Sequence, residues 1–367
     1  MKQDRIDRFR EKALENGLDG VGLMPGANML YLTGIHTHLS ERPIVLFIPV
    51  DDLPAIIIPT LEAGKAAAAG IPENRIFSWS DDDGYTGAFQ RASAQLELSG
   101  YLLGVEAYHM RLLELELLQR YAPGLNTAHV DSLITALRSV KDEDEISSVR
   151  KAVAIAEEAM VKLIPRLQIG QSEKQIASML IQELMTAGSE ASPFTPIVSA
   201  GPNGASPHAV PTNRAIQSGD FLVIDWGAVV DDYPSDITRT FAIGEANPEQ
   251  RRIYETVRLA NRNARAVARP GASGQDVDRA ARSVIEEMDY GPHFIHRTGH
   301  GLGLEVHEPP YMMEGNEEPL RTGVVFTIEP GIYIADSGGV RIEDNILITL
   351  AGSESLTTLS RELIQVG

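Results

Sequence analysis

The stretch FLVIDWGAVVDDYPSDITRTF, residues 221–241, decides how the second half of the chain folds. It opens with an apolar strand that has Asp225 near its end, and Asp236 follows eleven residues later at the start of a second strand-like run. Between them, Asp231-Asp232 predicts a turn. A strand, a turn and a returning strand would bring the two carboxylates side by side. Two ionised acids in a core repel and require a shared proton or a cation, whereas for this pair alone the alternative is two loop-end aspartates in solvent.

A histidine lies downstream in HRTGHGLGLEVHEPP, where Gly299 and Gly301 flank His300 and leave room around its imidazole. His307 follows in an apolar context, 304–306, that predicts a strand. An alternative is a zinc site formed by three histidines, His293, His296 and His300. The neighbouring glycines, however, do not predict the helix that would align these side chains.

Two glutamates complete a cluster of acids. We expect Glu329 to lie inside the apolar strand VVFTIEPGIYI and Glu343 inside the strand GVRIEDNILIT. A buried, uncompensated glutamate costs several kcal/mol, and Arg341 would serve Glu343 only in part. Four carboxylates and one imidazole, in a chain without cysteine, suit a pair of hard divalent ions such as Mn²⁺, Co²⁺ or Zn²⁺. The predicted ligands of this metal pair are Asp225, Asp236, His300, Glu329 and Glu343.

Composition limits the class of protein. The chain has 367 residues, 43% hydrophobic and 23% charged, which predicts a folded protein of two domains. The net charge of −19 argues against a broad nucleic-acid-binding face. No apolar run is long enough to span a membrane, and the charged N-terminus lacks the apolar centre of a secretory signal. We therefore expect a soluble, cytoplasmic protein with no nucleic-acid or membrane partner.

The pattern of predicted helices and strands changes near residue 132. Before it, helices and strands alternate, as in an α/β domain; after it, long helices precede mostly antiparallel strands, as in an α+β domain. We predict domains at 1–132 and 133–367. Asp142 is expected to cap a new helix, and further helices are expected at 172–186, 249–267 and 274–288.

Four motifs in order carry a family resemblance: DWGAVVDDYPSDITRT, TGHGLGLEVHE, FTIEPGIY and GVRIEDN. The chain resembles the "pita-bread" metallopeptidases, which include methionine aminopeptidases, aminopeptidase P and prolidase. The resemblance implies a C-terminal pita-bread catalytic domain, of α+β class, preceded by a smaller α/β creatinase-type domain. The chain departs from the family pattern in the turn, at Asp232, where glycine is usual, and at Pro234.

The resemblance also implies a role for each ligand. Asp225 would bind one ion, and His300 and Glu329 would bind the other. Asp236 and Glu343 would bridge both ions, and a bridging water or hydroxide would be the nucleophile.

Other roles implied by the resemblance concern the substrate. Glu329 would also shuttle a proton, and His307 would donate a hydrogen bond to the substrate carbonyl. His208, in SAGPNGASPHAVPTN, matches the second substrate-facing histidine. Tyr333 and Arg341 would hold the ligands in place.

The complete ligand set argues against creatinase and against non-catalytic relatives, which lack it, and so favours a peptidase for the Xaa-Pro bond. We favour an Xaa-Pro dipeptidase that uses Mn²⁺ and forms a homodimer, with an aminopeptidase P-like enzyme as the alternative. A non-catalytic module with a structural metal is a more remote alternative. The loop GIHTHLSERP could bind the carboxylate of a dipeptide through Arg42 and His38, or it could be a polar surface loop.

Overall fold

The computed structural model describes residues 1–367 and divides into two compact units, Met1–Arg138 and Ser139–Gly367. The boundary predicted after residue 132 falls inside the helix α6 (Asp131–Ser139). The two units divide between Arg138 and Ser139, at the end of that helix. None of the helices combines the length and the apolar composition needed to cross a lipid bilayer.

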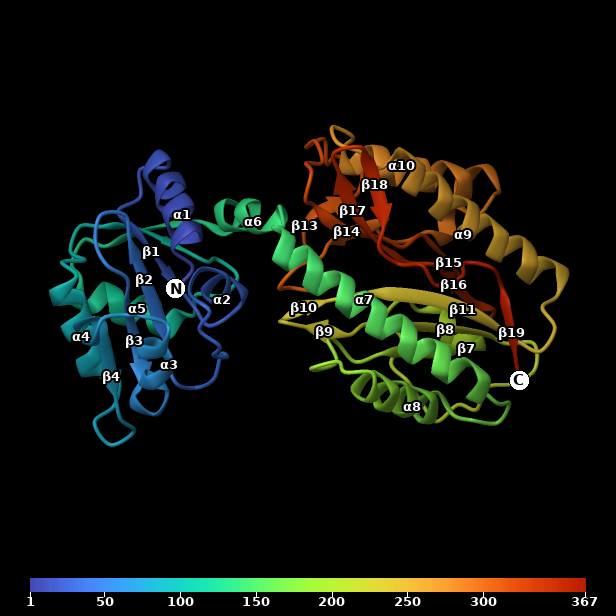
Figure 1. Ribbon diagram of the computed structural model, residues 1–367, viewed down its shortest axis with the longest axis horizontal. Helices are drawn as coiled ribbons and strands as arrows, with labels where there is room; N and C mark the ends of the chain where they lie inside the picture. The colour runs from blue at the N-terminus through green and yellow to red at the C-terminus, as the bar shows by residue number, and fades with distance from the viewer. The chain divides into compact units, whose positions relative to one another are not determined.

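The first unit is built on one six-stranded sheet of mixed direction, which confirms the predicted α/β class (Figure 1). Its strands, in order across the sheet, are β4 (Ile76–Trp79), β3 (Ala55–Pro59), β2 (Val45–Pro49), β1 (Gly20–Leu23), β5 (Leu102–Val105) and β6 (Asn126–His129). The remaining helices of the unit are α1 (Gln3–Glu15), α2 (Ala27–Thr33), α3 (Ala63–Ala68), α4 (Thr86–Gln95) and α5 (Leu112–Tyr121). The central strands are fully buried, as their continuous apolar sequences require.

The second unit contains two larger antiparallel sheets and two short hairpins. One sheet has the order β19 (Ile364–Val366), β11 (Ile237–Ile243), β8 (Phe221–Trp226) and β7 (Ile197–Ala200), with β19 parallel to β11. The other has the order β13 (Glu308–Met312), β12 (Gly299–Gly301), β14 (Val325–Ile328), β17 (Asp344–Thr349) and β18 (Gly352–Ser355). The hairpins are β9 (Val229–Val230) with β10 (Tyr233–Pro234), and β15 (Gly331–Ile334) with β16 (Gly338–Arg341).

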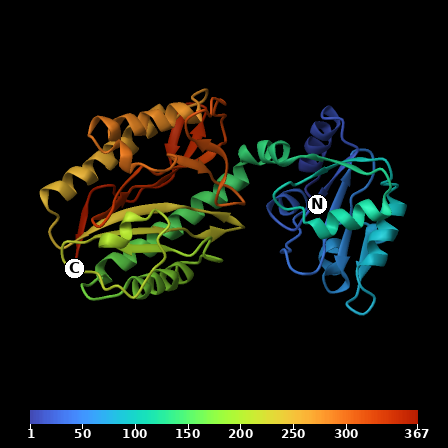
Figure 2. The ribbon, with the colours of Figure 1, turned by 180° about the vertical axis from the view of Figure 1, so that it is seen from behind.

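Two helix pairs cover these sheets on opposite sides, as Figure 1 shows and Figure 2 repeats from behind. The pairs are α7 (Glu143–Leu163) with α8 (Glu173–Thr186), and α9 (Pro248–Val267) with α10 (Gly274–Glu287). Each helix begins with a capping box that satisfies its free N–H groups, and the predicted cap at Asp142 is confirmed. The first pair packs against β7, β8 and β11, and the second against β14 and β17, so the α+β prediction is also confirmed.

Three expectations about local structure were wrong. Glu329 lies between β14 and β15, and Glu343 lies between β16 and β17, so neither is inside a continuous strand. His307 lies in a series of bends before β13 rather than in a strand. The apolar neighbours of the two glutamates are buried at strand ends, and those before His307 are partly buried in bends. Apolar sequence alone does not distinguish a strand from the break beside it.

Candidate metal centre and active site

Strands β8 and β11 bring the two aspartates together. They pair antiparallel with Asp225 opposite Thr238, and Asp236 immediately precedes β11. The hairpin between them turns at Asp231 and Asp232, whose φ angles of 51° and 68° are left-handed. Aspartate tolerates this conformation better than most residues, so the turn forms although glycine is usual at position 232.

Glycines allow β12 to approach its neighbours closely enough to place His300. A Cβ on Gly299 would lie 1.9 Å from the carbonyl oxygen of Thr327, and one on Gly301 would lie 2.4 Å from that of Pro309. The His300 Nδ1 lies 3.1 Å from the carbonyl oxygen of Gly301, which can only accept a hydrogen bond. Nδ1 therefore donates, and the lone pair of Nε2 is free for a metal.

The two glutamates are held by their backbones at breaks between strands. The N–H of Glu329 donates to Thr298 O at 2.7 Å, and the N–H of Glu343 donates to Thr238 O at 3.0 Å. The first bond joins the break after β14 to the segment before β12. The second bond joins the break before β17 to the strand β11. Both glutamates thereby reach the cluster of Asp225 and Asp236.

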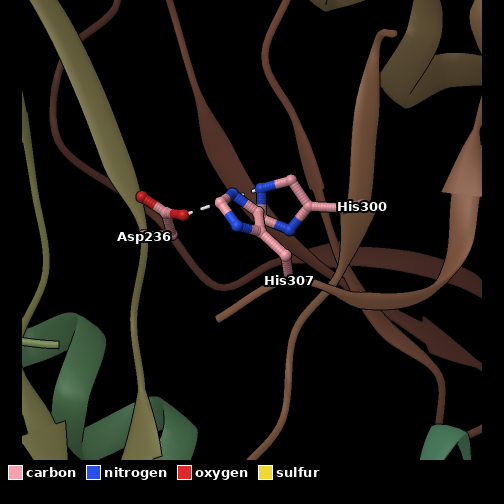
Figure 3. Close-up of side chains that lie close together, drawn as sticks. All are labelled: Asp236, His300 and His307. Carbon is pink, nitrogen blue, oxygen red and sulfur yellow. Dashed lines mark ion pairs between the residues drawn. The ribbon is translucent and has the colours of Figure 1, made fainter. Parts of the chain in front are cut away.

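The side chains form three overlapping groups whose ligand atoms lie within 4.8 Å of one another. The groups are Asp225 with Asp236 and Glu343, His300 with Glu329 and Glu343, and Asp236 with His300 and His307. His300 Nε2 is 3.4 Å from Glu329 Oε1 and 3.7 Å from Asp236 Oδ2. Figure 3 shows the third group, with the His307 ring against that of His300 at 4.2 Å between centroids.

The electrostatics of this cluster favour a cation. Asp225 Oδ1 and Glu343 Oε1 are buried without any hydrogen-bond partner.

The pKa values of the cluster point the same way. Burial, followed by the charges of nearby carboxylates, raises the pKa of Asp236 and of Glu343 well above the usual value. Burial also raises the pKa of Glu329 to about 7. Burial and the neighbouring His307 lower the pKa of His300 to about 3, which keeps it neutral as a metal ligand must be. Unpartnered carboxylate oxygens and a neutral imidazole fit divalent cations.

A chain of hydrogen bonds supports the cluster from behind. Arg341 Nη2 donates to Asp225 Oδ2 at 2.6 Å, and its Nη1 donates to the Tyr333 hydroxyl at 2.9 Å. The expected pairing of Arg341 with Glu343 is replaced by this bond to Asp225. The Tyr333 hydroxyl in turn donates to His296 Nε2 at 2.9 Å, because His296 Nδ1 already donates to the carbonyl oxygen of Arg297.

The cluster lies in a cavity of about 700 Å³ within the second unit. His208 and His307 line this cavity and are exposed, as are Val210 and Met313. Phe194, Ile197 and Val306 add to its partly apolar lining. The cavity therefore combines ligands at its base with two imidazoles and apolar surface above them, as expected for a binding site for a small molecule.

Arg42 and His38 lie in the first unit. The guanidinium of Arg42 makes two parallel hydrogen bonds to Asp81, at 2.8 and 3.1 Å, and contacts Glu41. His38 is exposed. The prediction that these two residues contact substrate stays a prediction.

Sequence reasoning missed three residues of the site. Thr238 donates its hydroxyl to Glu343 Oε2 at 2.6 Å and accepts from Arg341 Nε at 3.0 Å. Its place two residues after Asp236, at the start of the strand that follows, was a usable signal. His296 was considered only as a zinc ligand, and it contacts Tyr333 instead. Arg297 lines the cavity, and its guanidinium lies over the ring of Tyr311. No local sequence pattern predicts this contact.

Comparisons with known proteins identify the family of the chain. Residues 147–350 match the model of metallopeptidase family M24, and residues 5–140 match the creatinase/prolidase N-terminal domain. An Xaa-Pro dipeptidase from Pyrococcus horikoshii is 43% identical over 364 residues, which cover 99% of this chain and 98% of the relative.

Solved structures of similar proteins have the same pita-bread fold. A prolidase from Thermococcus sibiricus superposes with a TM-score of 0.94 and 35% identity, over 100% of this chain and 99% of that one. An X-Pro aminopeptidase from Thermotoga maritima superposes with a TM-score of 0.83 and 29% identity, over 97% and 100%. The chain therefore belongs to metallopeptidase family M24, and it carries an N-terminal domain of the creatinase/prolidase type.

Proposed function

We propose that this enzyme hydrolyses the Xaa-Pro peptide bond and that its preferred substrate is a dipeptide. The observation that carries the proposal is the buried cluster of acids with unpartnered oxygens at the base of a cavity that His208 and His307 also line. The Xaa-Pro dipeptidase of P. horikoshii, at 43% identity, supports the choice of substrate. The bond needs a dedicated enzyme because the proline nitrogen carries no hydrogen and its ring restrains the chain.

The proposed ligands are Asp225, Asp236, His300, Glu329 and Glu343. Glu343 shares one group with Asp225 and another group with His300. Asp236 likewise shares one group with Asp225 and another with His300. This sharing supports a bridging role for Asp236 and Glu343. His307 also belongs to one group, so the assignment of His307 to the substrate rather than to a metal requires its own test.

Bound divalent cations would supply Lewis acidity, polarising the scissile carbonyl and lowering the pKa of a water molecule. Around them, Glu329 is the proposed group that takes a proton from water and passes it to the leaving nitrogen. In the metal-free protein, burial raises the pKa of this carboxyl to about 7. Burial, then Arg297, lowers the pKa of His307, so its imidazole is neutral near pH 7 and has one N–H to donate to the carbonyl oxygen. His208, which also lines the cavity, would donate a second hydrogen bond to the substrate.

Dipeptides differ from longer substrates in having a carboxylate next to the proline ring. We propose Arg42 as the group that binds it, although the salt bridges to Asp81 and Glu41 would have to be exchanged for it. Arg297 is the second candidate, because it lines the cavity and its guanidinium contacts only a ring face there.

The test compares hydrolysis of an Xaa-Pro dipeptide with that of an Xaa-Pro tripeptide, in added Mn²⁺ and in added Co²⁺. A dipeptidase should prefer the dipeptide strongly, and equal rates would favour the aminopeptidase alternative. Arg42→Ala should raise the dipeptide KM about tenfold to hundredfold and leave the tripeptide unaffected, since a charge-assisted hydrogen bond contributes about 1.5–3 kcal/mol. A selective effect of Arg297→Gln, with none from Arg42→Ala, would transfer the role to Arg297.

Manganese as the physiological metal, a homodimer and a cytoplasmic location are further proposals. Metal analysis of the protein purified from its own cells and sedimentation of the purified enzyme test the first two. Absence of all peptidase activity in a protein that binds metal fully would favour the remaining alternative, a binding module with a structural metal.

A further inference from the structure

A buried ion pair lies beside the active site and has no part in the mechanism above. Lys141 Nζ donates to Glu308 Oε1 at 2.6 Å, and the two side chains are 1% and 2% exposed. Burying two charges costs desolvation energy, and apolar residues of similar size often stabilise a fold equally well. Stability alone therefore does not account for this pair, and the segments that its two side chains hold together are relevant.

Lys141 is fixed to the strand that leads to Glu329. Its backbone N–H donates to Gly323 O at 2.9 Å, and the preceding Val140 bridges antiparallel to Val324. Gly323 is in close contact, because a Cβ there would lie 3.0 Å from the carbonyl oxygen of Lys141. Strand β14 follows directly and ends before Glu329, so the backbone of Lys141 is hydrogen-bonded to the start of the strand that carries this proposed ligand.

Glu308 anchors the other end of the pair, immediately after His307. Its carboxylate occupies the space beside Gly303, where a Cβ would lie 2.3 Å from Glu308 Oε1. The segment 303–307, here called the histidine loop, therefore folds around this carboxylate. At its start, the N–H of Leu302 donates to Val325 O at 3.0 Å. Strand β14 thus holds one end of the loop, and Lys141 holds the other.

The imidazole of His307 depends on this loop for its position. It is exposed to the cavity and touches His300 ring to ring, but it makes no hydrogen bond to the protein. A side chain held only by a ring contact is oriented by its own backbone. The backbone of His307 is in turn fixed by the anchored carboxylate of the next residue.

We propose that Lys141 and Glu308 are a positioning pair that holds the histidine loop so that His307 faces the substrate. This rests on the proposed role of His307 in Xaa-Pro hydrolysis. Lys141 and Glu308 touch neither substrate nor metal in this account, and they act only through the loop. A displacement of about 1 Å in a catalytic group can cost about 10²-fold in rate.

The decisive experiment is a double-mutant cycle with His307 in the metal-loaded, full-length enzyme. Lys141→Met and Glu308→Gln should each lower kcat on an Xaa-Pro dipeptide about 10- to 100-fold, with KM and metal content nearly unchanged. In a His307→Ala background the same changes should lower kcat less than about threefold, because the positioned group is gone. Equal losses in both backgrounds would overturn the proposal.

Hydrogen exchange of the loop amides gives a readout that does not depend on activity. Protection at residues 303–307 should fall in Glu308→Gln, a variant of unchanged shape that keeps an acceptor for Lys141 Nζ but removes the charge that pairs with it. Arg150→Met, which breaks the half-exposed pair with Glu354, is the control and should change neither exchange nor kcat. Unchanged loop exchange in Glu308→Gln would overturn the positioning pair. Loosened exchange, together with normal turnover of His307→Ala, would instead contradict the proposed role of His307 and leave the pair as the anchor of the loop.

Discussion

Glu343 and Asp344 are neighbours in sequence, and both are buried, but they lie in opposite electrostatic surroundings. Glu343 joins three other acids, and one of its oxygens has no partner. Asp344 accepts hydrogen bonds from Arg239 at 2.8 Å, from Arg361 at 2.7 Å and from Asn261 at 2.9 Å. Burial would raise the pKa of Asp344, but Arg239 and Arg361 outweigh burial and lower it.

The comparison separates two reasons for burying an acid. The carboxylate of Asp344 is compensated within the protein, so its cluster can be explained by structure alone. The Glu343 cluster has too few protein cations, because Arg341 bonds only to Asp225 among its acids. The missing positive charge therefore marks a site for an external cation. Unpartnered oxygens, rather than acid content, distinguish the two clusters.

The largest expected effect is in the acid cluster. Glu343→Gln and Asp236→Ala should bind less metal than variants of the other ligands and should lose hydrolysis to the level of the chelated enzyme, because each residue is proposed to bridge both ions. Elemental analysis and a dipeptide assay measure this. Full metal content in Glu343→Gln would contradict the bridging role.

Asp344→Asn should affect stability instead. Removing this charge leaves the buried guanidinium of Arg239 without its carboxylate partner, which costs about 3–5 kcal/mol. Denaturant unfolding of the metal-free protein measures the loss, and the folded variant should still take up metal. A loss of metal without a loss of stability would show that the two clusters are not separate in function.

His307→Ala and His208→Ala should lower turnover about 10²–10³-fold, since each removes one hydrogen bond to the developing oxyanion. Their metal content should match that of the unmodified protein. Loss of metal in His307→Ala would make His307 a ligand, consistent with its place near Asp236 and His300.

The smallest expected effect is a pH dependence that has different forms in the two clusters. Because Glu329 has a folded pKa of about 7, the metal-free protein should lose stability as pH rises from about 4.5 to 7. Glu329→Gln should therefore stabilise the metal-free protein at pH 8, by on the order of 3 kcal/mol, and by progressively less toward pH 4.5.

The difference between Asp344→Asn and the unmodified protein should be constant from pH 8 to pH 5. The lowered pKa of Asp344 keeps its carboxylate ionised, folded or unfolded, throughout that range. Unfolding curves at several pH values measure both series. A constant difference for Glu329→Gln would contradict its raised pKa.

Local sequence predicted most of the fold. The strand Phe221–Trp226 and the cap at Asp142 follow from apolar runs and capping chemistry, which act over a few residues. The strand breaks at Glu329 and Glu343 could not be predicted, because the chain leaves its strands there to bond to Thr298 and Thr238. Such partners are distant in sequence.

The candidate site was predicted less evenly. The five proposed ligands were chosen because uncompensated acids and one glycine-flanked histidine stand out in an apolar sequence. Arg297 and the Lys141–Glu308 pair were missed, because their importance depends on contacts with Tyr311 and with the histidine loop. A lysine or glutamate in a polar stretch has no local mark of burial.

The most direct test of the central claim is a count of metal ions per chain. Protein stripped with a chelator, dialysed against Mn²⁺ and freed of excess metal should contain two ions per chain by elemental analysis and should regain hydrolysis of an Xaa-Pro dipeptide. Protein that takes up no metal, and that hydrolyses the dipeptide equally well in the presence of chelator, would contradict the account.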